Sequence, residues 1–210
     1  MAKNILAHKI LIIDFGSQYT QLIARRVREL GVYCEIYSHQ SNLKSIKDFD
    51  AKGIILSGGP ETVKQKGSPK VPIGMFDLGI PILGICYGMQ TITKQLGGKV
   101  ELASKREFGH ANLKISNQGG GLFKNIKDKT TSVWMSHGDH VTDLPEGFKI
   151  IAKSANSPIA AFFDPKKKIY GLQFHPEVTH TPQGKKILKN FVRDICNCQG
   201  LWNSKNIIDK

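Results

Sequence analysis

Residues 81–90 read Pro-Ile-Leu-Gly-Ile-Cys-Tyr-Gly-Met-Gln, and this stretch predicts a buried strand that turns directly into a helix. The apolar run over residues 80–85 is typical of a buried strand, and the helical pattern over residues 89–96 ends at a glycine pair. Cys86 lies between two glycines at the turn, as the nucleophile does in a nucleophile elbow. The alternative is a small buried cysteine at an ordinary strand end, and this stretch alone does not separate the two.

The chain before this stretch alternates strand and helix patterns. Continuous apolar runs over residues 9–14, 32–37 and 53–57 predict strands that are buried on both faces. Apolar residues at helical spacing over residues 22–30 predict a helix between the first two strands. This order predicts an α/β fold with a mostly parallel central sheet flanked by helices.

The second half of the chain is richer in strand patterns. They fall at residues 99–103, 111–116, 132–136, 148–152, 159–163 and 169–174. Their close spacing predicts antiparallel additions to the main sheet or a small antiparallel side sheet. A last amphipathic pattern over residues 183–196 predicts a helix.

A thiol nucleophile needs a base, and the base needs an orienting group. His175-Pro176-Glu177 follows a predicted strand directly, and residues two apart in an extended segment point the same way. His175 could therefore face Cys86 while Glu177 orients its ring. Alone, this motif reads more readily as a surface turn. Paired with a cysteine elbow, it is better interpreted as a catalytic base and its orienter.

Two glycine-containing segments could complete such a site. Ser57-Gly58-Gly59-Pro60 ends a strand at the same predicted sheet edge as Cys86, and it is either an ordinary tight turn or a source of N–H groups for an oxyanion. Residues 136–140, Ser-His-Gly-Asp-His, predict a polar loop that could bind substrate. His137 and His140 compete with His175 as the base, although neither has a carboxylate two residues on.

The composition is that of a globular protein with an excess of basic residues. The 210 residues include 30 Lys and Arg against 17 Asp and Glu, a formal net charge of +13. The lysines are spread along the chain, without the long basic tract and interleaved aromatics of a nucleic-acid-binding segment. The charge therefore predicts a solvated surface, suited to an acidic partner surface, with no nucleic-acid partner.

Other sequence features argue against membrane, disulfide and metal classes. The chain contains no run near the roughly 18 apolar residues of a membrane span, and its N-terminus lacks the apolar region of a signal peptide. We therefore expect a cytoplasmic protein with no membrane partner. The four cysteines are too few and scattered for a disulfide framework, and no Cys/His spacing predicts a metal site.

Taken together, these motifs resemble the three signatures of the class I (triad) glutamine amidotransferases. They are Gly84-Ile85-Cys86-Tyr87-Gly88-Met89-Gln90, Ser57-Gly58-Gly59-Pro60 and His175-Pro176-Glu177. The resemblance implies that Cys86 attacks the glutamine carboxamide, that His175 moves the protons and that Glu177 orients His175. It also implies an oxyanion site at the Gly59 and Tyr87 N–H groups. The implied glutamine-binding residues are Gly58, Gln90, Ser136, His137, Gly138 and Asp139.

Within this family the chain resembles the branch that forms the amidotransferase part of GMP synthetases. The matching stretches include Asp14 to Leu22, Arg106-Glu107-Phe108-Gly109 and Trp134 to Asp139. The resemblance implies an amidotransferase domain over residues 1–200 and, over residues 201–210, the start of a linker to an ATP pyrophosphatase domain. Glutamine and that domain are the implied partners. No cofactor is expected in this chain, because the absent domain would use the ATP and Mg²⁺.

Three functions stay open at this point. The first is glutamine hydrolysis through a glutamyl thioester, supplying ammonia for amination of XMP to GMP. The second is a catalytically idle docking or regulatory module, against which the intact Cys86, His175 and Glu177 argue. The third is another amidotransferase or a γ-glutamyl hydrolase on the same scaffold.

Overall fold

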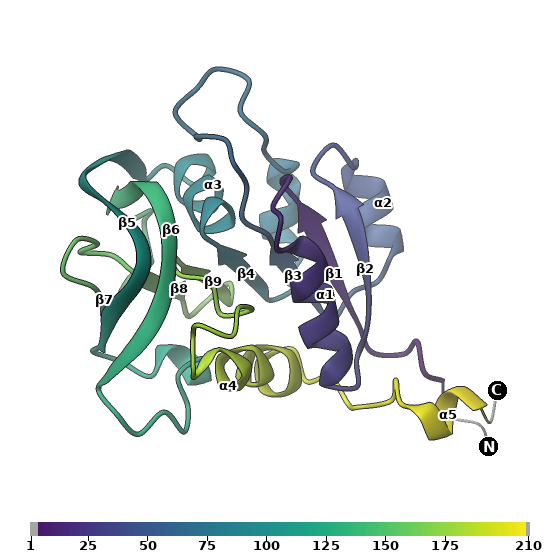
Figure 1. Cartoon of the computed structure of the whole chain (residues 1–210). Coiled ribbons are helices and arrows are strands. Elements are labelled where there is room, and N and C mark those ends of the chain that lie inside the picture. Colours follow the sequence, from purple (N-terminus) through teal and green to yellow (C-terminus); the bar gives the residue numbers. More distant parts are fainter. Residues whose placement is uncertain (1–3, 209–210) are drawn as a thin grey trace.

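A computed structural model describes residues 4–208, which form one sheet of nine strands with helices on both faces of its parallel half (Figure 1). The strands are β1 (Lys9–Asp14), β2 (Tyr33–Ser38), β3 (Gly53–Leu56), β4 (Ile82–Ile85), β5 (Lys99–Ile115), β6 (Thr130–Asp143), β7 (Lys149–Lys153), β8 (Ala161–Asp164) and β9 (Ile169–Leu172). The helices are α1 (Thr20–Glu29), α2 (Leu43–Asp48), α3 (Tyr87–Gln95), α4 (Gly184–Lys189) and α5 (Ser204–Ile208), with 3₁₀ turns at Ile73–Asp77 and Gly119–Gly121 and a π-helix at Asn190–Ile195. Expectations for residues 1–3 and 209–210 lie outside the described residues.

The parallel half of the sheet confirms the predicted α/β fold. Strands β2, β1, β3, β4 and β9 lie side by side in that order, and all run parallel. β9 comes last in the chain, yet it lies between β4 and the antiparallel strand β8. The carboxyl ends of β3, β4 and β9 therefore meet at one edge, where ligands bind in open α/β sheets.

Alternate residues of the parallel strands supply two hydrophobic cores, one on each face of the sheet. Ile10 and Ile12 of β1 belong to the core that includes side chains of α1 and α4, whereas Leu11 and Ile13 belong to the core with α2 and α3. This period of two within a continuous apolar run is what a strand covered on both faces requires.

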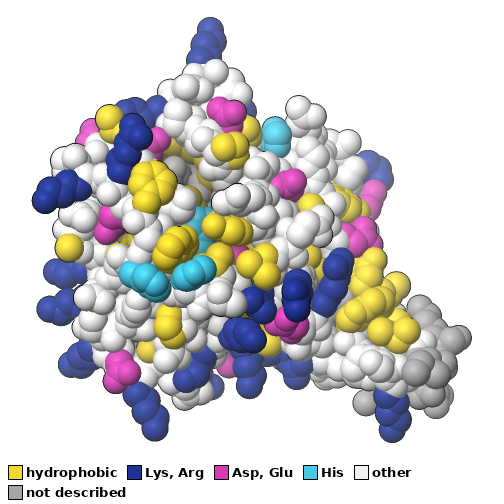
Figure 2. All heavy atoms as spheres, viewed as in Figure 1, with side chains coloured by type: hydrophobic (Ala, Val, Ile, Leu, Met, Phe, Trp, Pro, Cys, Tyr) yellow, Lys and Arg dark blue, Asp and Glu magenta, His cyan; other side chains and the backbone are white. Residues whose placement is uncertain are grey.

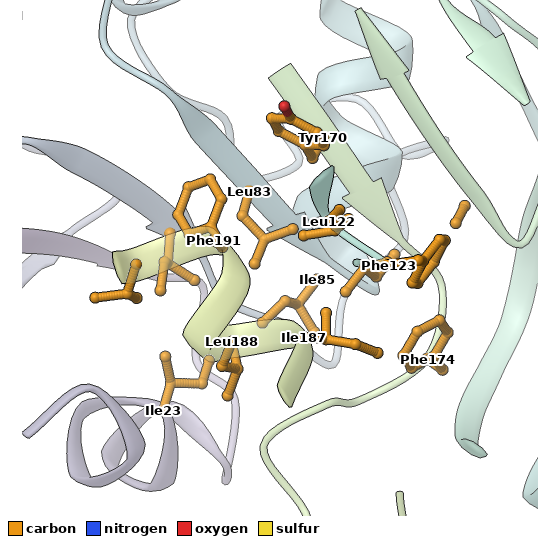
Figure 3. Packing of buried hydrophobic residues seen from close by; sticks show 14 of the residues in the cluster. Ile23, Leu83, Ile85, Leu122, Phe123, Tyr170, Phe174, Ile187, Leu188 and Phe191 are labelled. Carbon is orange, nitrogen blue, oxygen red and sulfur yellow. The ribbon is translucent and has the colours of Figure 1, made fainter. Parts of the chain in front are cut away.

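The first core anchors the strand that leads to the cysteine. Figure 3 shows Leu83 and Ile85 of β4 in one cluster with Ile187 and Leu188 of α4, and all four side chains are buried. Fully burying a side chain of this size contributes about 1.5–3 kcal/mol. The packing of α4 therefore fixes β4, and with it the turn at Cys86.

The antiparallel half departs from the sequence prediction in its strand lengths. Residues 99–103 and 111–116 do not form separate strands, because β5 runs unbroken through the polar residues between them. β5 pairs with β6 in a long ladder at the end of the sheet, where one face in solvent accepts polar side chains. The antiparallel strands thus continue the main sheet, one of the two predicted arrangements.

The surface has a dispersed positive charge. Figure 2 shows Lys and Arg side chains scattered over the visible face, without a single basic tract. Within residues 4–208, no helix combines the length and the apolar content that a membrane crossing requires.

Candidate active site

Cys86 occupies the turn between β4 and α3 in a backbone conformation that L-residues rarely adopt, with φ 53° and ψ −107°. A residue held in such a region costs about 1–3 kcal/mol. Hydrogen bonds hold the turn in place: the Cys86 N–H donates to the Leu172 carbonyl at 2.7 Å, and the Gly88 N–H donates to the Ser57 carbonyl at 3.0 Å. The turn therefore has the strained geometry of a nucleophile elbow, with Cys86 at the N-terminus of α3.

His175 and Glu177 come just after β9 and form a buried pair. His175 Nδ1 lies 2.6 Å from Glu177 Oε1, and the His175 N–H donates to the Trp134 carbonyl at 2.9 Å. Burial lowers the pKa of His175, but the Glu177 charge and the hydrogen bonds to Cys86 and Glu177 outweigh it and raise this pKa well above its ordinary value. The ring therefore carries its second proton at neutral pH.

The structure brings Cys86 and His175 together beside Gly58. A Cβ added at Gly58 would lie 3.1 Å from His175 Cε1 and 3.7 Å from Cys86 Cβ. Both residues line a pocket of about 250 Å³, where the Tyr19 ring packs edge-on against the His175 ring at 5.2 Å between centroids. Cys86 Sγ also lies 3.5 Å from the Ser136 carbonyl oxygen. One thiol, one imidazole and one carboxylate thus lie close together at the sheet edge.

Two backbone N–H groups beside the thiol are free to bind an anion. Gly59 and Tyr87 line the same pocket as Cys86. Neither N–H donates a hydrogen bond to another group within residues 4–208, and Tyr87 is the first residue of α3, whose N–H has no acceptor inside the helix. Free N–H groups in this position can stabilise a developing oxyanion.

A larger pocket of about 520 Å³ also reaches Cys86. Its lining includes Gln90 and residues 136–139, which the sequence assigns to glutamine binding. Gln90 is buried, and its Nε2 donates to the Asp139 carbonyl at 2.9 Å and to Gln173 Oε1 at 3.2 Å. Gly58, the remaining residue of the predicted glutamine-binding set, does not line this pocket. It lies beside Cys86 and His175 instead.

The predicted loop over residues 136–140 was wrong, because these residues lie within β6. Ser136 pairs with Phe108, and His137 pairs with Glu107, in the antiparallel ladder with β5. Polar residues around a glycine suggest a loop from sequence alone, but the partner strand supplies their backbone hydrogen bonds here. The pocket wall is therefore a strand of fixed register.

The geometry removes His137 and His140 as competing bases. His137 Nδ1 lies 2.8 Å from the Asp139 carbonyl oxygen, and His137 Nε2 lies 2.9 Å from Glu107 Oε2. Both ring nitrogens are therefore occupied by groups other than Cys86. His140 Nδ1 lies 3.1 Å from the Asn156 carbonyl oxygen, and His140 does not line the pocket.

Gln173 and Glu107 are buried at the site but were missed by the sequence reasoning. Gln173 Nε2 lies 3.7 Å from Cys86 Sγ, and Glu107 holds His137. Gln173 had a usable signal, because it lies two residues before His175, directly after β9. Glu107 had no comparable local signal for a place in the site, because its partner His137 is 30 positions away on another strand.

The other three cysteines differ from Cys86 in their surroundings. Burial raises the pKa of Cys34 and of Cys198 to about 11, and it raises the pKa of Cys196 well above its ordinary value. These thiols are therefore protonated and unreactive at neutral pH. Across the part of the chain that the structure describes, no group of three or more His, Cys, Asp or Glu side chains is placed to hold a metal ion.

Comparison with known proteins identifies the family of this chain. The glutamine amidotransferase class-I family profile matches residues 11–195. GMP synthases [glutamine-hydrolyzing] of Marinobacter nauticus and Hahella chejuensis are 55% and 54% identical to this chain over 100% of its length. The chain spans 41% of the length of each of these two relatives.

Two solved structures share the fold of this chain. The crystal structure of a putative GMP synthase subunit from Thermoplasma acidophilum superimposes with a TM-score of 0.80 at 31% identity, covering 97% of this chain and 98% of that one. A Thermotoga maritima glutamine amidotransferase, 20% identical, shares the fold with a TM-score of 0.66 over 90% of this chain and 84% of that one. Since the family profile spans the sheet edge with the cysteine elbow and the His-Glu pair, the chain is an enzyme of the glutamine amidotransferase class-I family.

Proposed function

We propose that the chain hydrolyses glutamine to glutamate and ammonia through a Cys86–His175–Glu177 triad. The observation that carries the proposal is that the Cys86 thiol shares a pocket with an imidazole whose Nδ1 is 2.6 Å from a buried carboxylate. The raised pKa of His175 supports an imidazolium beside the sulfur, which can protonate the departing nitrogen.

The reaction proceeds in two halves. The Cys86 sulfur attacks the carboxamide carbon of glutamine, and the Gly59 and Tyr87 N–H groups stabilise the oxyanion. His175 gives its proton to the departing nitrogen, so ammonia leaves and a glutamyl thioester remains. His175, now neutral, takes a proton from water, whose oxygen attacks the thioester and releases glutamate and the thiolate. Glu177 keeps the His175 ring oriented throughout.

The amino-acid end of glutamine occupies the larger pocket. Gln90, the Asp139 carboxylate and the β6 segment from Ser136 to Gly138 line it, which supports recognition of a charged ammonium and carboxylate there. Ammonia passes to an ATP pyrophosphatase domain that binds ATP and Mg²⁺ and aminates XMP to GMP. The names and greater lengths of the GMP synthase relatives support this last step.

The test is glutamine hydrolysis by the purified chain, with and without the ATP pyrophosphatase part of a GMP synthetase. Glutamate and ammonia should appear in equal amounts, and the pair should form GMP from XMP with glutamine as the nitrogen source. Hydrolysis without glutamine-dependent GMP formation would leave the glutaminase but remove the GMP assignment. No hydrolysis under either condition would favour an idle docking module.

Glu177→Gln should move the alkaline limb of the glutaminase pH profile to lower pH. The Glu177 charge raises the pKa of His175, and His175 must be protonated to release ammonia. The folded-state pKa of His175 is raised above its unfolded-state pKa of about 6.5. The charged ring therefore stabilises the fold below the unfolded-state pKa, and this stabilisation is lost as pH rises through the folded-state pKa. The parent should therefore lose thermal stability over that alkaline range, and Glu177→Gln should lose less. An unmoved limb would contradict the role of Glu177.

A further inference from the structure

A second buried histidine–glutamate pair lies behind the glutamine pocket. Glu107 and His137 are only 7% and 4% exposed, and His137 Nε2 donates to Glu107 Oε2 at 2.9 Å. The Ser157 hydroxyl donates to Glu107 Oε2 at 2.7 Å, and the Ser154 hydroxyl donates to Oε1 at 2.9 Å. Burial raises the pKa of Glu107, but the hydrogen bonds from His137 and the two serines outweigh it and hold this pKa below its ordinary value. The pair is therefore a buried carboxylate hydrogen-bonded to the His137 ring.

An irregularity in the sheet places Glu107 there. The β5–β6 register passes from Leu102 opposite Asp139 to Glu107 opposite His137, so β5 has extra residues between these two pairings. Bulges of this kind re-aim side chains and are frequent beside active sites. Here Glu107 points inward, whereas the next residue, Phe108, is 67% exposed.

The pair holds the strand segment that forms the pocket wall. His137 Nδ1 donates to the Asp139 carbonyl, and the same carbonyl accepts the Gln90 side chain. On the other side of His137, the Ser136 carbonyl contacts Cys86 Sγ. Glu107, Ser154 and Ser157 do not line the pocket, whereas His137 does, so Glu107 acts on glutamine only through His137 and this segment.

We propose that Glu107 is a positioning residue for glutamine binding: its buried hydrogen bond with His137 fixes the β6 segment that contacts Cys86 and Gln90. This inference rests on the proposed glutaminase function. It adds a role for a carboxylate outside the triad and outside the pocket.

Variants that remove one or both partners of the Glu107–His137 pair test this role. Glu107→Gln replaces the carboxylate that accepts from His137 with an amide, so a buried ring loses its charge-assisted hydrogen bond. Glu107→Gln/His137→Gln leaves two amides that can hydrogen-bond each other, so the double variant should regain part of what the single variant loses. Ser157→Ala keeps the Glu107–His137 hydrogen bond and removes one donor to Glu107.

The experiment compares two alkylating probes on Cys86. The glutamine analogue 6-diazo-5-oxo-L-norleucine must occupy the pocket before it reacts, whereas iodoacetamide reports the thiolate alone. In Glu107→Gln we expect labelling by the analogue to slow at least about tenfold and the KM for glutamine to rise by a similar factor. Iodoacetamide labelling and kcat should change far less. Ser157→Ala should show the same pattern at smaller amplitude.

Glu101→Gln is the matched control, because it removes an exposed carboxylate from the same strand. It should leave both labelling rates unchanged. Equal slowing by both probes, or a fall in melting temperature without a change in KM, would overturn the positioning role. If Glu107→Gln does not fold, the two labelling rates and the KM of Ser157→Ala test the positioning role instead. If the parent itself is not labelled by the analogue, the proposed glutaminase function fails instead.

Discussion

Replacing Cys86 by alanine is expected to lower the rate of glutamine hydrolysis at least about 10³-fold, because the nucleophile of a covalent mechanism has no substitute in the site. Gln173 and Ser136 contact the sulfur, but an amide and a backbone carbonyl cannot form a thioester. The measurement is glutamate release by the purified variant, with far-ultraviolet circular dichroism to show that it folds.

Two further variants serve as comparisons for Cys86→Ala. Cys34→Ala removes a buried thiol beneath α1 and should keep the hydrolysis rate, because Cys34 lies outside both pockets that reach Cys86. Cys86→Gly should be as inactive as Cys86→Ala but more stable by about 1 kcal/mol, since glycine adopts φ 53° without a Cβ clash. A hydrolysis rate unchanged by the loss of the Cys86 thiol would disprove the mechanism.

Gly88→Ala is expected to destabilise the fold by about 3 kcal/mol, roughly 6–12 °C in melting temperature. A Cβ at this position would lie 2.4 Å from the Leu56 carbonyl oxygen and 2.8 Å from the Leu56 Cβ. Both are at or next to the backbone of a central strand, so neither can move aside cheaply. The new methyl group must push α3 away from β3 and stretch the 3.0 Å hydrogen bond from the Gly88 N–H to the Ser57 carbonyl.

Thermal and denaturant unfolding measure this effect. Lys94→Ala, at an exposed position of the same helix, should change the unfolding free energy by less than about 0.5 kcal/mol. Any folded Gly88→Ala protein should also react more slowly with glutamine, because Tyr87 moves with α3. Equal melting temperatures for Gly88→Ala and the parent would show that the contact between α3 and β3 is looser than described.

The sequence predicted best where one local pattern decides the structure. Continuous apolar runs identified the parallel strands, because a strand covered on both faces has no polar alternation to confuse it. The His175-Pro176-Glu177 motif was predicted to be extended with its imidazole and carboxylate on one side; Pro176 and Glu177 lie in a turn instead, yet the two side chains are 2.6 Å apart. In both cases the residues that form the pattern are close together in the sequence.

Prediction failed where a distant segment decides. Residues 136–140 contain the polar side chains and glycine of a loop, and only pairing with β5 makes them a strand. Glu107 looks like an exposed acid among charged neighbours until the register shift turns it inward against His137. Such partners depend on which strands pair and in what register, and local composition does not encode that register.

The position of β9 has a consequence for how the protein becomes active. Strand β4 pairs with β9, whose first paired residue, Ile169, is far along the chain from its partner Ile82. A nascent polypeptide emerging from the ribosome therefore completes the thiol-bearing turn long before the strand that supports it exists. Closure of the sheet and delivery of the histidine are one event, because His175 follows β9 by three positions and the Cys86 N–H binds its last residue, Leu172. In an unfinished chain Cys86 therefore lacks His175 beside it, and the two side chains meet only when β9 is inserted into the sheet.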